Sequence, residues 1–122
     1  MSWILRWLAA FVLTQCVEMG IYVQAHDASP EAGPRPLRER VAIAFACSAI
    51  THPLVWFVVL DVASAIGVDG YWGQVAVAEA FAVLTEAAFL ACFGVRRALA
   101  WSLAANATSV VVGLFCYTRL GW

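Results

Sequence analysis

The sequence predicts an all-α membrane protein, a bundle of four transmembrane helices joined by short loops. Composition is the first indication: 64% of the 122 residues are hydrophobic and 12% are charged, against about 45–50% and about 25% in typical soluble domains. The second indication is a set of four apolar runs, each close to the ~20 residues that a helix needs to cross a bilayer. Little chain remains between these runs, so we expect residues 1–122 to form a single transmembrane domain.

The expected spans are separated by segments that are unfavourable for a membrane helix. The first connection, "HDASPEAGPRPLRER", is polar and holds three of the four prolines. The second, "SAIGVDGYWG", contains three glycines, and the third, "GVRRA", is a tight turn. The spans therefore cover about residues 3–25, 40–62, 73–95 and 98–120.

The first span has an alternative interpretation as a signal peptide. Arg6, an apolar stretch and "VQA" before His26 are typical of such a segment. The span is long, however, and carries Gln15 and Glu18 late in its apolar part. We therefore expect a retained helix.

Arginines indicate an orientation. Only Arg6 and Arg119 lie at the end of the bundle that holds the termini, whereas the opposite end carries five arginines. Cytoplasmic loops are enriched in positive charge, so we expect an integral protein of a bacterial inner membrane, with loops one and three in the cytoplasm and both termini outside. Interfacial aromatic residues would form a belt at the terminal end: Trp3, Trp7, Tyr71, Trp72, Tyr117 and Trp122.

Several classes of function find no support in the sequence. The net charge is −1 and the basic residues are scattered arginines, so no nucleic-acid partner is expected. A glycine-rich phosphate loop, a dinucleotide fingerprint and a nucleophile elbow are all missing. The absence of these motifs favours a protein that is not an enzyme and leaves a metal-dependent enzyme as the least supported alternative.

Polar side chains inside the predicted spans form stripes. They are separated mostly by three, four or seven residues, so within each helix they share one face. Lipid surrounds the bundle, so these faces should turn inward. The four stripes are Gln15, Glu18 and Tyr22; Ser48, Thr51 and His52; Glu79 and Glu86; and Ser102, Asn106 and Ser109.

Residues of four different spans reach a similar depth, roughly 12–18 Å from the arginine-rich end at about 1.5 Å per residue. They are Glu18, His52, Glu86 and Asn106. Glu79 lies about 10 Å further toward the terminal end, where Asp61 marks the end of the second span. The spacing predicts a ladder of polar groups through the interior.

The cost of these carboxyl groups favours a function over a purely structural role. A charge at the bilayer centre costs about 2.5–3.5 kcal/mol, whereas a polar contact between membrane helices contributes only about 0.6 kcal/mol on average. The leading hypothesis is movement of a proton or small cation. Its residues would be Glu18, Tyr22, His52, Glu79, Glu86 and Asn106.

Two alternatives remain open. The protein could be a non-catalytic subunit or assembly factor of a larger membrane complex, with the polar stripes fixing helix register. It could also bind a divalent metal through Glu18, His52 and Glu86, because carboxylates with one imidazole suit zinc, manganese or iron. Alanines spaced four residues apart allow close helix approach, so besides the lipid bilayer we expect a homo-oligomer or a larger complex as partner.

Pro53 is expected to disturb the second helix, because it cannot donate a hydrogen bond to the carbonyl of Ala49. Membrane helices tolerate this where a nearby hydroxyl satisfies the freed group. Ser48 and Thr51 are placed to do so.

The chain resembles uncharacterised bacterial four-span membrane proteins. The shared features are the first-helix Glu18, a polar-residue–Pro pair in "THPLVW", the third-helix glutamate pair and the stripe in "SLAANATS". The resemblance covers most of the chain. It implies the four-span fold and no established activity.

Overall fold

The computed structural model describes residues 2–25 and 33–121, and these are almost entirely helical. Four of the described helical stretches are long and apolar enough to cross a membrane, which confirms the predicted four-helix fold class. The elements are α1 (Trp3–Tyr22), α2 (Leu37–Leu54), η1 (Val55–Val59), α3 (Leu60–Ala65), α4 (Tyr71–Cys92) and α5 (Ala98–Leu120).

The second span differs most from its expected bounds of 40–62. It consists of α2, η1 and α3 and runs from Leu37 to Ala65. It begins directly after Pro36, whose fixed φ suits the residue that precedes a helix. It ends shortly before Gly67, which has a φ of 88° that favours glycine.

The other spans match their expected bounds within three residues. α1 ends at Tyr22 rather than at 25, and α4 begins at Tyr71, directly after Gly70, rather than at 73. α4 ends at Cys92 rather than at 95, because the chain turns through Gly94 with a φ of 75°. Trp122, the last member of the expected aromatic belt, lies outside the described residues.

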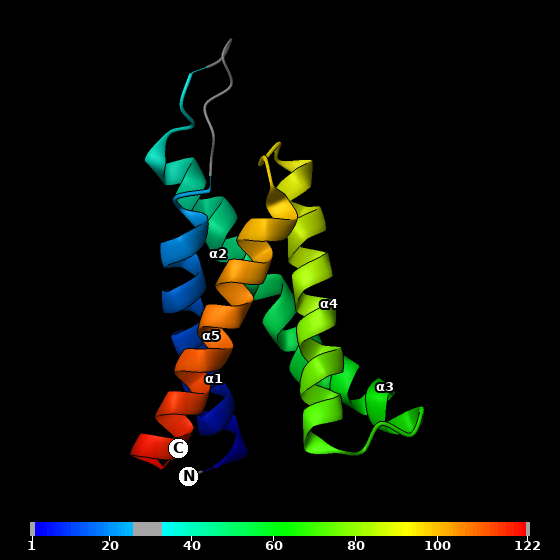
Figure 1. Cartoon of the computed structure of the whole chain (residues 1–122). Coiled ribbons are helices and arrows are strands. Elements are labelled where there is room, and N and C mark those ends of the chain that lie inside the picture. The colour runs from blue at the N-terminus through cyan, green and yellow to red at the C-terminus, as the bar shows by residue number, and fades with distance from the viewer. Residues whose placement is uncertain (1, 26–32, 122) are drawn as a thin grey trace.

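The long helices form a ring in which each contacts two neighbours: α1 packs against α2 and α5, and α4 packs against α5 and α2. Figure 1 shows that α4 and α5 are close together near their connecting turn and diverge toward the opposite end. Both termini and the connection at residues 66–70 lie at that diverging end. We call it the terminal end and the other the arginine-rich end.

The effect of Pro53 takes the form of a π-helical turn. Pro53 lies inside α2, and the π-helical segment η1 follows two residues later. The amide of Leu60 donates to the carbonyl of Val55, five residues earlier rather than four. Such single π-turns are typical where the regular ladder of a helix is interrupted.

The described residues of the arginine-rich end are held together by packing and by contacts of two arginines. The Arg40 guanidinium donates to the carbonyl of Val23 at 2.6 and 2.9 Å, which ties α2 to the end of α1. Arg35 donates to the carbonyl of Phe93 at 2.9 Å. Beneath these contacts lies an apolar core, formed by Tyr22, Ala25, Ile43, Ala44, Cys47, Leu90, Val95, Ala98 and Ala105.

Candidate functional site

Glu86 is held by side chains from three other helices. It lies in the C-terminal third of α4 and is only 1% exposed. Its Oε2 accepts hydrogen bonds from the hydroxyl of Tyr22 in α1 and, at 2.9 Å, from the amide of Asn106 in α5. Its Oε1 accepts from the hydroxyl of Thr51 in α2. All three donors are neutral, so they stabilise a carboxylate without cancelling its charge.

Glu18 has an arrangement of its own, with hydroxyl partners on two helices. It is 2% exposed. Its Oε2 pairs with the Ser48 hydroxyl at 2.6 Å and its Oε1 with the Ser109 hydroxyl at 2.9 Å. Both oxygens of both buried carboxyl groups are therefore satisfied, as buried polar groups require.

Asn106 also fixes α5 against α4. Besides reaching Glu86, its amide donates to the carbonyl of Ser102 at 3.0 Å. The Ser102 hydroxyl in turn donates across to the carbonyl of Val83 in α4 at 2.8 Å. The polar stripe of α5 therefore both contacts Glu86 and positions the helix that carries it.

The two carboxyl groups line one cavity. It has a volume of about 180 Å³, and its polar walls come from all four spans. We call it the polar cavity. Its polar lining residues are Thr14, Glu18, Thr51, His52, Glu79, Glu86, Asn106 and Ser109.

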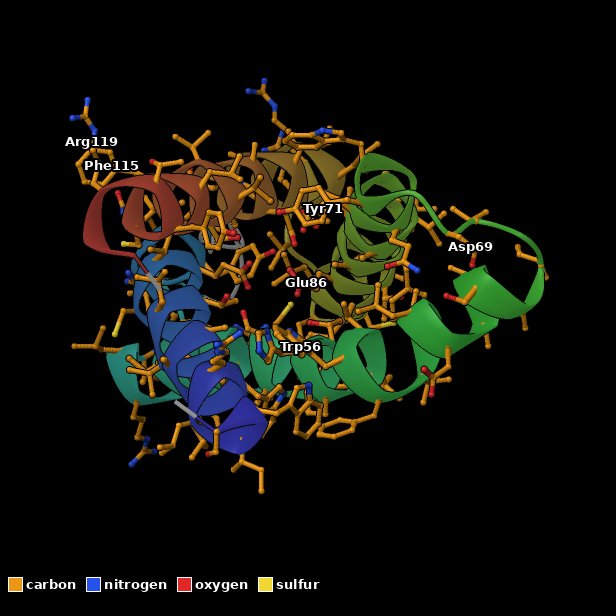
Figure 2. All side chains as sticks on the ribbon, turned by 90° about the horizontal axis from the view of Figure 1, so that it is seen from below. Trp56, Asp69, Tyr71, Glu86, Phe115 and Arg119 are labelled. Atoms are coloured by element: carbon orange, nitrogen blue, oxygen red, sulfur yellow. The ribbon has the colours of Figure 1, made fainter. Side chains whose placement is uncertain are left out.

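A second cavity of about 440 Å³ continues from the polar cavity toward the terminal end. Trp56 and Glu79 line both cavities. We call this second space the aromatic vestibule, because Trp56, Tyr71, Trp72 and Tyr117 contribute to its walls. In Figure 2, viewed from the terminal end, Glu86 lies in the hollow of the bundle with Trp56 and Tyr71 on opposite sides of it.

His52 reaches the polar cavity from an aromatic surrounding. Its ring centroid lies 5.3 Å from that of Phe11, 6.0 Å from that of Trp56 and 6.1 Å from that of Trp7. The side chain is 9% exposed, and its Nε2 has no hydrogen-bond partner in the part of the chain that the structure describes. His52 therefore shares the cavity with the glutamates, and its Nε2 bonds neither of them.

No basic side chain of the described residues forms an ion pair with the buried carboxyl groups of Glu18 and Glu86. Within the described ranges, an ion pair is formed between Arg35 and Glu39 at the arginine-rich end, where a guanidinium nitrogen lies 3.7 Å from a carboxylate oxygen. Among those same residues, no three His, Cys, Asp or Glu side chains are grouped so as to hold a metal ion. The expected metal set of Glu18, His52 and Glu86 thus receives no support from the geometry.

The six residues expected to form the site lie around the polar cavity or beside it, but they do not form a single hydrogen-bonded group. Tyr22, Glu86 and Asn106 form one hydrogen-bonded group, Glu18 lies in a second, and His52 and Glu79 line the same cavity. Asp61, the expected outer end of the ladder, is exposed and lines neither cavity. The ladder therefore begins at Glu79.

Four further contributors were not assigned to the site from the sequence. Three of them, Ser48, Thr51 and Ser109, lie on the predicted polar stripes and pair with the glutamates. The fourth is Trp56, which lines both cavities. The three hydroxyl residues lie on the same polar stripes as His52 or Asn106, and this spacing could have assigned them to the site. Nothing in the sequence distinguished Trp56 from an interfacial tryptophan.

Removing the Tyr22 hydroxyl should weaken the bundle measurably. Tyr22 is fully buried and its hydroxyl donates to Glu86, so Tyr22→Phe removes one donor while keeping the ring. We expect the free energy of unfolding to fall by about 0.6–1.7 kcal/mol, the range measured for polar contacts between membrane helices. Unfolding in mixed detergent micelles, followed by circular dichroism, measures it. Tyr117→Phe, at an exposed position, is the control, and equal stability of the two variants would contradict the prediction.

Comparisons with protein-family models, with curated proteins and with solved structures find no match to this chain.

Proposed function

We propose that this integral membrane protein moves protons or small cations through its polar cavity. The observation that carries the proposal is the charge balance of the interior. Glu18 and Glu86 are almost fully buried, their partners are neutral donors, and the described residues offer them no ion pair. A charge left alone in the bilayer interior is costly, so each carboxyl group is stable there with a bound proton or beside a cation.

The surrounding groups suit a binding site that exchanges its occupant. Hydroxyl and amide donors can hold a carboxylate when the proton or cation has left, and Tyr and Thr hydroxyls can reverse their role when the carboxyl is protonated. In this proposal Glu86 and Glu18 bind the transported species. Glu79 meets it first, His52 supplies the unpartnered nitrogen, and Tyr22 and Asn106 position Glu86.

Among the described residues, the proposed route is open toward the terminal end. The aromatic vestibule leads from the terminal end to the polar cavity, whereas the apolar core lies between that cavity and the arginine-rich end. This arrangement favours a carrier that changes conformation over a continuously open pore. The arginine distribution places the closed end in the cytoplasm in our proposal, with both termini outside.

Flux measurements on the purified protein in lipid vesicles test the proposal. Vesicles containing a pH-sensitive dye, with an imposed potential and a chosen external cation, should take up protons or that cation faster than protein-free vesicles. Absence of any excess flux across proton, sodium and potassium gradients would overturn the proposal. Co-purification with another membrane protein in mild detergent would, in that event, favour the subunit role.

A further inference from the structure

Glu79 differs from the other two glutamates of the interior. Glu18 and Glu86 have donors on both oxygens, whereas no side chain in the described part of the protein donates a hydrogen bond to Glu79. Glu79 is partly buried and lines both cavities. Its carboxylate therefore stands at the junction of the two spaces with its hydrogen-bonding capacity uncommitted.

The aromatic vestibule, which lies on the proposed route, also has the size and lining of a site for a small organic ligand. A volume of about 440 Å³ falls in the usual range for pockets that bind small organic molecules, about 300–1,000 Å³. Its walls are mostly apolar and aromatic, with Glu79 as the acidic residue among them. Hard inorganic cations prefer six or more oxygen ligands, and the vestibule does not provide them.

Aromatic faces and a carboxylate are complementary to one kind of ligand. Tyrosine and tryptophan rings attract a cation placed over their faces, and quaternary ammonium groups are recognised in this way. The rings of Trp56 and Tyr71 flank the hollow from opposite sides, as Figure 2 shows. A ligand there would meet rings on its flanks and a negative charge at the inner end.

We infer that the aromatic vestibule binds an organic ammonium ion with an apolar body, and that Glu79 is its counter-ion. The rings of Trp56, Tyr71 and Tyr117 contact the apolar body and the charged methyl groups. The inference rests on the proposed function in one respect only, that the interior attracts cations. Binding itself requires neither flux nor a membrane potential.

Two probes of equal shape separate charge recognition from simple apolar binding. Benzyltrimethylammonium carries the positive charge, and neopentylbenzene replaces its nitrogen by carbon. Binding to the purified full-length protein in a non-ionic detergent is measured by calorimetry and by the quenching of tryptophan fluorescence. We expect the ammonium compound to bind at least about tenfold more tightly than its neutral analogue, a ratio typical of a desolvated cation–π site with a counter-charge.

Matched variants assign the binding to the vestibule. Glu79→Gln should weaken ammonium binding by about tenfold or more and leave the neutral analogue unaffected. Asp69→Asn is its control, because Asp69 is exposed at the same end of the bundle and lies outside the hollow in Figure 2. Tyr71→Leu should weaken binding about threefold. Phe115→Leu, on the exposed outer face of α5, should not.

The outcomes distinguish this inference from the proposed function. Equal binding of the two probes would overturn the inference and identify the vestibule as a pocket for lipid tails. No binding of the ammonium compound, or unchanged binding to a folded Glu79→Gln variant, would overturn it as well. Charge-dependent binding by a protein that gives no flux in vesicles would leave the ammonium site in place and remove the transport proposal.

Discussion

Glu86→Gln is expected to reduce proton or cation flux in vesicles to the level of protein-free vesicles. Glutamine keeps the shape of the side chain. Its amide oxygen can still accept hydrogen bonds from the Tyr22 hydroxyl and the Asn106 amide, so the helices should remain packed. It can neither bind and release a proton at neutral pH nor balance a cation. Measuring the flux of wild type and variant, reconstituted at equal protein density, gives the comparison.

A matched control removes a carboxylate outside the cavity. Glu39→Gln breaks the ion pair with Arg35 at the arginine-rich end and should leave the flux unchanged, because exposed pairs contribute little. Circular dichroism should show the same helix content for both variants. Normal flux in a folded Glu86→Gln protein would be incompatible with a role of this carboxyl group in transport.

Leu90→Ala is expected to lower the free energy of unfolding by about 1–3 kcal/mol. Leu90 is fully buried in the apolar core, and truncation leaves a cavity between α4 and its neighbours. The lipid is as apolar as leucine, so the transfer term is small and the loss comes from packing. Unfolding in mixed detergent micelles measures this loss.

Leu84→Ala is the control for this substitution. Leu84 lies on the same helix, α4, but 64% of its side chain is exposed, which in a membrane means contact with lipid. Its truncation should change the free energy of unfolding by less than about 0.5 kcal/mol. Equal destabilisation by the two substitutions would contradict the prediction, because it would mean that packing of Leu90 in the core stabilises the protein no more than contact of Leu84 with lipid.

The fold class followed from physical constraints that the sequence carries directly. In lipid, a backbone must satisfy its hydrogen bonds internally, so four apolar runs of sufficient length become four helices. The inward direction of Glu18, Glu86 and Asn106 followed from helical periodicity. Their bonding partners also came from these stripes, because residues on one face at one depth have few alternatives in a small bundle.

Other features depend on tertiary geometry that periodicity does not encode. The depth of His52 along its helix predicted its place beside the glutamates. The direction of its side chain around the helix axis, however, brings its ring against Phe11 and Trp7. Asp61 was placed in the ladder by its depth alone, but its side chain is exposed, because on a helix it does not share the face of His52 nine residues earlier. The vestibule arises from the divergence of α4 from α5, which no local pattern predicts.

The position of the apolar core also has an electrical consequence for the proposed transport. The polar cavity and the vestibule are wide enough for water, which would carry the potential of the solution at the terminal end inward. The transmembrane voltage would then drop mainly across the apolar core around Leu90 and Val95. An elementary charge passing this layer would gain or lose most of the full voltage, about 2.3 kcal/mol per 100 mV. The short step beyond Glu86 would therefore be the voltage-sensitive one.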